Sequence, residues 1–241
     1  MPRRYFKKHL TDSQIQQIQT VFSSLDYGTD IKLGEAYKHD CAVVFFDLCN
    51  FTNISWTIGE STILEILQEL FRFTSAKVNS HDGMIDKYPG DGVVAFFPRN
   101  YSIETDYIVE GALDCIAEVM YWFYDHFRLQ YDLPKPSHQL DLAVGIDAGK
   151  ISIAHVGSIY HSEIILLGDQ VNCASKCQQV ATCKEVVIGQ DAANRVRRIY
   201  SNYFSTGPST GIIYTKSNSK YLSYRFDWEM FSKNSSWIDK P

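Results

Sequence analysis

A wholly apolar run of six residues, Cys41–Phe46, ends directly at the acidic residue Asp47 and limits the folds open to this chain. Its β-branched and aromatic side chains predict a buried strand. No wholly apolar run in the chain is longer, and a membrane-spanning helix needs about 20 such residues, so we expect no membrane span and no membrane partner. A buried strand must be covered by other elements, so the chain is expected to fold around it as a layered globular domain.

Downstream of this run, helical and strand patterns alternate. The spacing of apolar residues predicts three helices, one beginning at the capping residue Ser61, one over 104–127 and one over about 169–180. The first helix is expected to bury Leu64, Leu67, Leu70, Phe71 and Val78. Further strands are expected at 83–88, 93–97, 140–146, 150–155, 185–188, 212–214 and 221–226. Hairpins are expected across Asp147–Gly149 and around Ser217–Ser219, which gives an α/β (α+β) fold with helices on a mixed, mostly antiparallel sheet.

The organisation predicted along the chain is one main domain over 40–228. It is preceded over 1–39 by a tail, a capped amphipathic helix at Thr11–Leu25 and a connector, and it is followed by a tail over 229–241. The basic N-terminus lacks the apolar stretch of a secretory signal. The six cysteines form no CxxC pair, so we expect buried thiols rather than disulfides or a zinc site, and a cytoplasmic protein.

The charge balance is 23 basic against 28 acidic residues, a net charge of −5. Such a chain lacks the basic surface that binds a nucleic-acid polymer, so we expect no partner of that kind. Any binding of phosphate groups must then depend on cations placed locally at the site.

Two acidic residues follow neighbouring segments of the predicted sheet. Asp47 ends the first buried strand, and Asp91 lies in the turn after the next strand. The helix between these strands is expected to return the chain to a parallel strand, so both carboxylates project from one sheet edge, where they can hold two divalent cations. The alternative, for each residue taken singly, is an ordinary strand end for Asp47 and an ordinary turn residue for Asp91.

Four short motifs support the pairing. The chain reads FDLCNFT at Phe46–Thr52, KYPGDG at Lys87–Gly92, GIDAG at Gly145–Gly149 and GDQVNCASK at Gly168–Lys176. In this order and spacing they resemble the class III nucleotidyl cyclase catalytic domain, whose motifs are F-x-D-(I/L)-x-x-F-T, K-x-x-G-D, G-I-x-x-G and G-x-x-V-N-x-A-(S/A)-R. The resemblance extends from about Cys41 to Phe226 and implies a ferredoxin-like cyclase domain.

The reaction of that family is the attack of the 3′-hydroxyl of a ribonucleoside triphosphate on its own α-phosphate. Pyrophosphate leaves, and a 3′,5′-cyclic monophosphate remains. The resemblance implies two divalent cations, Mn²⁺ or Mg²⁺, held by the carboxylates of Asp47 and Asp91 and by the backbone carbonyl of Leu48.

Other positions of the motifs are expected to contact the triphosphate. The resemblance implies that backbone N–H groups of Asn50, Phe51 and Thr52 bind its β- and γ-phosphates, although the same turn could be an ordinary helix entry. Asn172 matches the asparagine that stabilises the transition state. Lys176 stands where the family has arginine, so it keeps the positive charge but loses the planar fork of donors.

Two further implications concern the lysine of the last hairpin and the assembly. Lys216 falls at the triphosphate lysine of the family, and a solvated hairpin lysine is the equal alternative. In the family, the residues equivalent to Asp47 and Asp91 meet those equivalent to Asn172 and Lys176 only across a head-to-tail dimer. We therefore expect a homodimer with two symmetric active sites at its interface.

The base of the substrate is expected to contact Phe45, Lys87 and Ile165, which occupy the base-reading positions of the family. Lys87 does not suit guanine, and Ile165 cannot form the hydrogen bond that completes an adenine site. A cationic donor between bulky apolar side chains suits a smaller base with a carbonyl acceptor. This combination is similar to the pyrimidine cyclases of the bacterial Pycsar antiphage system, which make cyclic UMP or cyclic CMP to act on a separate effector.

Three alternatives stay open on the sequence alone. UTP is expected ahead of CTP, although the O2 carbonyl, which both bases offer, does not distinguish the two. An adenylate cyclase with a relaxed base pocket would carry the same motifs. A non-catalytic cyclase-like dimer that binds nucleotide is the third reading, and it is disfavoured because Asp47, Asp91 and Asn172 are all present.

Overall fold

The computed structural model describes residues 31–100, 107–131, 139–214 and 219–238. The helix expected at Thr11–Leu25 and the candidate residue Lys216 lie outside the described residues. In the ranges that are described, no helix combines the length and apolar character needed to span a bilayer. All six cysteines are free thiols, and four of them are buried as expected, whereas Cys49 and Cys183 are half-buried.

One eight-stranded sheet forms the centre of the molecule. Its order is β2-β3-β1-β4-β6-β10-β7, and β5 pairs with β4. The strands are β1 (Ala36–Cys49), β2 (Met84–Lys87), β3 (Val93–Pro98), β4 (Asp141–Ser158), β5 (His161–Leu167), β6 (Val186–Gly189), β7 (Phe204–Thr206) and β10 (Ser223–Phe226). Only β4 and β6 pair in parallel among the described strands. The mixed, mostly antiparallel sheet predicted from the sequence is therefore confirmed.

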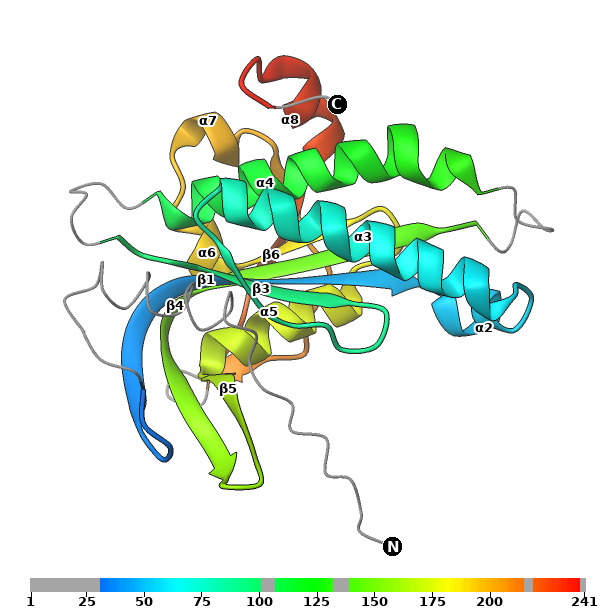
Figure 1. Cartoon of the computed structure of the whole chain (residues 1–241). Helices are drawn as coiled ribbons and strands as arrows, with labels where there is room; N and C mark the ends of the chain where they lie inside the picture. Colours follow the sequence, from blue (N-terminus) through cyan, green and yellow to red (C-terminus); the bar gives the residue numbers. More distant parts are fainter. Residues whose placement is uncertain (1–30, 101–106, 132–138, 215–218, 239–241) are drawn as a thin grey trace, which may run out of the picture.

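Helices cover both faces of this sheet, with α3 and α4 on one face and α5 on the other (Figure 1). The helices are α2 (Phe51–Ser55), α3 (Glu60–Ser80), α4 (Ile108–Trp122), α5 (Asp169–Val180), α6 (Gln190–Ala193), α7 (Arg198–Ser201) and α8 (Trp228–Asn234). A π-helical turn, Phe123–Phe127, and a 3₁₀ turn, Arg128–Gln130, extend α4. Helix α8 packs on α4, so the end of the described chain is part of the folded domain.

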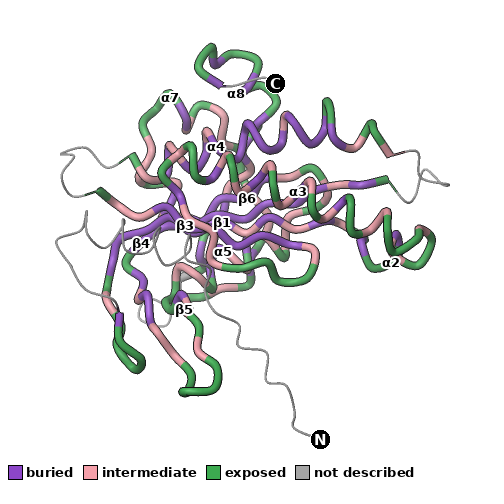
Figure 2. Tube along the Cα trace, viewed as in Figure 1, coloured by how far each residue is buried: buried purple, intermediate pink, exposed green. Residues whose placement is uncertain are grey.

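Strand β1 separates two hydrophobic clusters, because successive side chains of a strand point to opposite faces. Ala42, Val44 and Phe46 belong to the cluster beneath α3 and α4. Cys41 and Val43 belong to the cluster beneath α5. Figure 2 shows the central strands as a continuous buried layer. Asp47 follows the alternation of the second set and therefore lies on the α5 face.

The hairpin expected across Asp147–Gly149 is wrong, because this segment is the middle of the single strand β4. Strand β4 pairs with β1 without interruption from Ala154 opposite Ala36 to Asp141 opposite Cys49. Gly149 occurs here for a reason other than a turn, because helix α5 lies very close to β4 at this position. A Cβ atom at Gly149 would lie 2.7 Å from the side chain of Gln170 on that helix.

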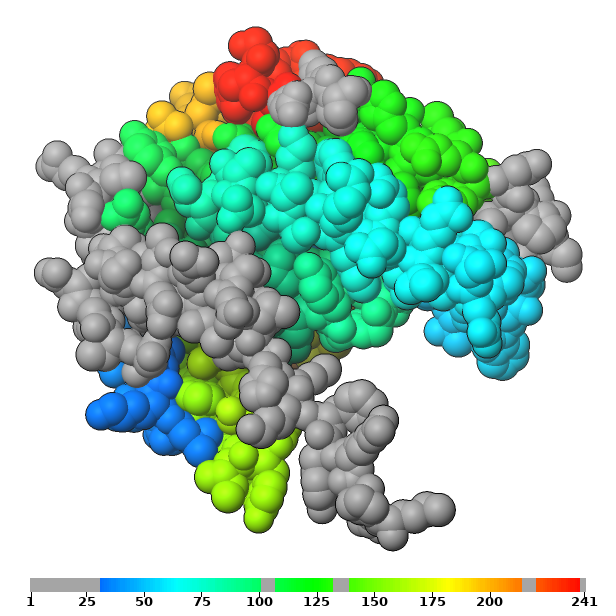
Figure 3. Space-filling view, viewed as in Figure 1, coloured from blue at the N-terminus to red at the C-terminus, as the bar shows by residue number. Residues whose placement is uncertain are grey.

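The chain instead turns at Ile159 and Tyr160, between β4 and β5. This hairpin projects from the body of the molecule beside the start of β1 (Figures 1 and 3). Its tip residues are the most exposed apolar side chains of the hairpin, at 86% and 80%.

Two smaller expectations also need correction. Helix α3 begins at Glu60 with Gly59 as its N-cap rather than at Ser61, and Leu64 is exposed whereas Leu70 and Val78 are buried. In the C-terminal region, β8 (Ile213–Tyr214) pairs with β9 (Ser219–Lys220). The segment expected to complete that hairpin, 221–226, instead supplies β10 to the main sheet between β6 and β7, where Phe226 is buried.

Candidate active site

Asp47 and Asp91 meet at one edge of the sheet. Strands β1 and β2 are both antiparallel to β3, so they run in the same direction, and the β2–β3 turn with Asp91 lies beside the end of β1. A Cβ atom at Gly92 in this turn would lie 2.8 Å from the carbonyl of Phe46 and 3.1 Å from Oδ1 of Asp47. Only glycine therefore lets the turn approach the Asp47 carboxylate so closely.

The two carboxylates carry unfavourable charge in the absence of a cation. Burial and the negative charge of Asp91 raise the pKa of Asp47 from 3.8 to about 6. Burial also raises the pKa of Asp91. A divalent cation between the two groups would relieve this repulsion, so the residues present fit a metal site of hard oxygen ligands.

The described residues supply few ligands beyond this pair. Among the described residues no group of three histidine, cysteine, aspartate or glutamate side chains is placed to hold a metal ion. The side chain of Leu48 is buried on the α3 and α4 face, so its backbone carbonyl is the group it can offer. Water or a bound phosphate group could supply the remaining ligands of a cation at this edge.

The turn after β1 leads straight into a helix. Asn50 has a left-handed backbone conformation, with φ of 57°, and is the N-cap of α2. Its carbonyl accepts from the N–H groups of Asn53 and Ile54 at 3.0 and 3.2 Å. The first N–H groups of a helix have no partner within the helix, so those of Phe51 and Thr52 are available to an anion.

A β-bulge places two of the candidate base-reading residues in one row. Val94 on β3 is opposite Phe45 on β1 and opposite Lys87 on β2, because the register of β2 shifts between Ile85 and Lys87. Residues directly opposite in an antiparallel pair point to the same face, so Phe45 and Lys87 share the α5 face. The Lys87 side chain is 42% exposed, and its Nζ lies 3.5 Å from a carboxylate oxygen of Asp86.

The third base-reading candidate, Ile165, lies on β5, opposite Ala154 of β4, and is half-buried. Strand β5 contacts β2. Burial raises the pKa of Asp86 on β2 to about 6, while the charge of Lys87 lowers it and that of Glu163 on β5 raises it. The segments that carry Lys87 and Ile165 are therefore neighbours.

Helix α5 presents its functional positions on two opposite sides. Asn172 and Lys176 are one turn apart and exposed, and Lys176 donates to Oε1 of Gln179 at 2.8 Å. Ala174 and Gln178 lie about 200° around the helix axis from them and face the sheet. The structure of one chain thus keeps Asn172 and Lys176 on the outer side of the helix whose inner side contacts Asp47.

One residue of this site is not apparent from the sequence. Nε2 of Gln178 donates a hydrogen bond to Oδ2 of Asp47 at 3.0 Å. Helical spacing from the buried Ala174 indicates that Gln178 faces inward, but no local pattern identifies a partner on another strand. Gln178 is thus the link between α5 and the carboxylate pair.

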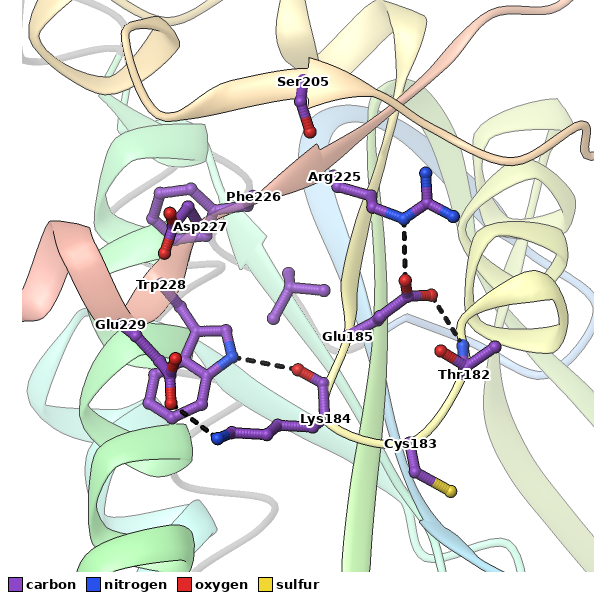
Figure 4. A pocket seen from close by; sticks show the side chains of 11 residues that line it. Thr182, Cys183, Lys184, Glu185, Ser205, Arg225, Phe226, Asp227, Trp228 and Glu229 are labelled. Carbon is purple, nitrogen blue, oxygen red and sulfur yellow. Dashed lines mark hydrogen bonds and ion pairs between the residues drawn. The ribbon is translucent and has the colours of Figure 1, made fainter.

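A pocket of about 400 Å³ lies between the start of β6 and α8 (Figure 4). Its charged side chains pair with one another, Arg225 with Glu185 at 2.7 Å and Lys184 with Glu229 at 2.6 Å. The indole of Trp228 donates to the carbonyl of Lys184 at 3.0 Å. These contacts stabilise the packing of α8 and leave the cations of the pocket neutralised.

A second pocket of about 520 Å³ lies where β3 ends at Pro98 and α4 begins at Ile108. This is the end of β3 away from the turn that carries Asp91. In this pocket Arg197 donates to the Glu110 carboxylate from three groups, its backbone N–H, Nε and Nη2. Neither pocket contains a residue that the sequence motifs indicate.

Comparison with known proteins identifies the family of the chain. The family model of the adenylate and guanylate cyclase catalytic domain matches residues 35–226. The chain therefore belongs to the adenylate and guanylate cyclase catalytic domain family. It is similar to the terminal-differentiation specific adenylate cyclase of Dictyostelium discoideum, with 27% identity over 157 residues, which is 65% of this chain and 7% of that protein. An uncharacterised protein of Mycobacterium tuberculosis is 27% identical over 152 residues, 62% of this chain and 24% of that protein.

Solved structures show the same fold at low identity. The adenylyl cyclase CyaB from P. aeruginosa has a TM-score of 0.66 at 19% identity, over 85% of this chain and 99% of that one. The guanylate cyclase domain of RhGC from Catenaria anguillulae, in complex with GTP, has a TM-score of 0.63 at 17% identity, over 80% and 98%. The predicted cyclase fold is thus confirmed, while the chain spans only a small part of the curated relatives it matches.

Proposed function

We propose that the chain is a nucleotidyl cyclase that converts a pyrimidine ribonucleoside triphosphate, UTP in preference to CTP, into the 3′,5′-cyclic monophosphate and pyrophosphate. The observation that carries the proposal is the meeting of Asp47 and Asp91 at one sheet edge, with a pKa of about 6 at Asp47. Two carboxylates in this state are suited to divalent cations that bind a triphosphate. Family membership makes cyclisation the reaction to test.

Different residues of the chain would have different roles in that reaction. Asp47, Asp91 and the carbonyl of Leu48 would hold two Mn²⁺ or Mg²⁺ ions, which supply charge stabilisation for the attacking 3′-oxygen and the leaving pyrophosphate. The N–H groups of Phe51 and Thr52 would bind the terminal phosphates. The 3′-hydroxyl loses its proton to water, a new bond forms from the 3′-oxygen to the α-phosphorus, and the bond from that phosphorus to the pyrophosphate oxygen breaks.

Transition-state residues would come from a second copy of the chain. Asn172 and Lys176 are exposed and point away from the Asp47 of their own chain. In a head-to-tail homodimer the same residues of one copy would face the carboxylate pair of the other. The amide of Asn172 would then orient the ribose and α-phosphate, and the Lys176 ammonium would stabilise the charge that develops there.

The residues at the three base-reading positions support a pyrimidine. Lys87 offers an ammonium donor to a carbonyl oxygen of the base, and Phe45 in the same row offers an apolar face. Ile165 has no group that pairs with the amino group of adenine. Lys216, which lies outside the described residues, is proposed as a further cation for the triphosphate.

The test is incubation of the purified protein with Mn²⁺ and, separately, UTP, CTP, ATP or GTP, with products identified by mass spectrometry. Cyclic UMP is the expected main product, and Asp47→Ala and Asp91→Ala should abolish its formation while leaving the far-UV circular dichroism spectrum unchanged. Cyclic AMP as the sole product would refute the pyrimidine assignment. Binding of nucleotide without pyrophosphate release would establish the non-catalytic alternative.

We further propose that the cyclic pyrimidine nucleotide is a second messenger for a separate effector in antiphage defence. The support is the similarity of Phe45, Lys87 and Ile165 to the base pocket of Pycsar cyclases. A bacterial host expressing the wild-type chain should accumulate the cyclic nucleotide after phage infection, and a host expressing Asp91→Ala should not. An unchanged level in infected wild-type cells would contradict this role.

A further inference from the structure

Gln178 makes the one side-chain hydrogen bond recorded for the Asp47 carboxylate within the described part of the chain. Its Nε2 lies 3.0 Å from Oδ2 of Asp47, and the two residues are 131 positions apart. This bond lowers the pKa of Asp47, against the larger effects of burial and of Asp91 that raise it. The amide therefore acts directly on the ionised form of the group proposed to bind metal.

The position of Gln178 is fixed by the packing of α5 on β4. A Cβ atom at Gly145 of β4 would lie 2.1 Å from the backbone nitrogen of Gln178 and 2.5 Å from the carbonyl of Ala174. The helix backbone thus rests on the strand with no side chain between them. Gly145 is opposite Phe45 on β1, two residues before Asp47, so this contact sets the distance between Gln178 and the carboxylate.

The bond also distinguishes the two oxygens of the carboxylate. Oδ2 accepts from Gln178, whereas Oδ1 faces Gly92 in the turn that carries Asp91. A carboxylate held by one oxygen has a fixed plane, and its other oxygen has a fixed direction. Oδ1 is thereby oriented toward the place where a cation shared with Asp91 would bind.

We propose that Gln178 is a positioning residue for the divalent-cation site, which it serves by holding Oδ2 of Asp47 so that Oδ1 is directed at the cation. The inference rests on the proposed metal role of Asp47. A primary amide suits this task because it donates a hydrogen bond without adding charge. Lysine here would compete with the cation, and glutamate would add a third negative charge to a site that already resists ionisation.

The experiment measures Mn²⁺ binding directly, by the loss of the electron paramagnetic resonance signal of free Mn²⁺ on titration of the protein without nucleotide. Four chains are compared: wild type, Gln178→Leu, Asp47→Asn and Gln190→Leu. Gln190 is a matched control, since its side chain also makes one hydrogen bond, to the N–H of Leu222 at 3.1 Å, at the far end of β6.

Gln178→Leu should weaken Mn²⁺ binding about 10-fold or more, as loss of an outer hydrogen bond to a metal ligand commonly does. Gln190→Leu should bind Mn²⁺ as the wild type does. Turnover of Gln178→Leu should recover toward the wild-type kcat as Mn²⁺ is raised, because the ligands themselves remain. A purely structural role would instead lower the melting temperature and leave the Mn²⁺ affinity of the folded fraction unchanged.

The two levels of the hypothesis fail separately. If Asp47→Asn binds Mn²⁺ as tightly as the wild type, the proposed metal site is wrong, and the inference about Gln178 is overturned with it. If Asp47→Asn loses Mn²⁺ but a folded Gln178→Leu binds it normally, the metal site stands and the role of Gln178 is refuted. Should Gln178→Leu not fold, Gln178→Asn replaces it, because the shorter amide cannot reach Oδ2, and the same comparison decides.

Discussion

Replacing Asp47 with asparagine should stabilise the metal-free protein while it abolishes activity. Asparagine has nearly the size of aspartate, and its carbonyl can still accept the hydrogen bond from Gln178. It carries no charge, so the repulsion from Asp91 and the cost of burying an ionised group disappear. The carboxylate of Asp47, which the site needs for function, thus lowers the free energy of unfolding of the metal-free protein.

The size of the effect follows from the pKa of Asp47, about 6 in the folded protein against an ordinary 3.8. At about 1.4 kcal/mol per pKa unit, a fully buried carboxylate would lower the free energy of unfolding by about 3 kcal/mol at pH 7.5. Asp47 is only half-buried, and screening by solvent reduces the expected value to about 1–1.5 kcal/mol. Because the folded-state pKa is raised, this cost is absent below pH 3.8 and becomes complete as the pH rises through about 6.

The assay is urea unfolding followed by tryptophan fluorescence, in EDTA and at one fixed protein concentration, at pH 7.5 and pH 4.5. Asp47→Asn should exceed the wild type by about 1–1.5 kcal/mol at pH 7.5, or about 2–6 °C in melting temperature, and by much less at pH 4.5. Asp82→Asn, at an exposed turn, is the control and should show no comparable gain. A loss of stability at pH 7.5, or a gain independent of pH, would refute the reasoning.

Three further outcomes are expected. Gly145→Ala should lower the free energy of unfolding, measured in urea, by about 1–3 kcal/mol, because its Cβ atom would lie 2.1 Å from the α5 backbone. Gly59→Ala is the control and should change this free energy little, because its Cβ atom would meet only Ser61 Oγ, at 4.0 Å. Tyr221→Phe removes the 2.6 Å hydrogen bond to buried Asp147, and should cost about 1.5–3 kcal/mol at pH 7.5. The pKa of Asp147 is raised by burial to about 6, so this cost should shrink at pH 4.5; an equal loss at both pH values would contradict the assignment. Mixing inactive Asp91→Ala and Asn172→Ala chains should restore roughly a quarter of wild-type turnover, measured as pyrophosphate release, because half of the dimers would hold one intact site; no restoration would argue against a site shared by two chains.

Strong local patterns explain which parts of the fold are predictable from the sequence. The Cys41–Phe46 run lies inside β1, and the helix predicted over about 169–180 coincides with α5. The sequence predicts a turn in the middle of β4 because Asp147 and Gly149 are residues typical of turns. In the structure Gly149 contacts α5 and Asp147 contacts Tyr221, and both partners are distant in sequence. Local propensity therefore predicts a hairpin where the chain forms a continuous strand.

The candidate site divides in the same way. Asp47 and Asp91 could be paired from the sequence because a general rule, the return of a crossover to a parallel strand, places both at one edge. The bulge that brings Lys87 into the row of Phe45 has no sequence signature, since the register shift depends on how β2 meets β3. Gln178 has no sequence signature for a similar reason, because its partner Asp47 is 131 residues away in the chain.

Helix α5 serves two active sites at once in the proposed homodimer. Its inner side rests on Gly145 and holds Asp47 of its own chain through Gln178. Its outer side offers Asn172 and Lys176 to the other copy. Displacement of this helix by Gly145→Ala would disturb the carboxylate of one site and the transition-state residues of the other. A dimer of one wild-type and one Gly145→Ala chain should therefore lose turnover at both sites, whereas a dimer with one Asp91→Ala chain should keep one site fully active.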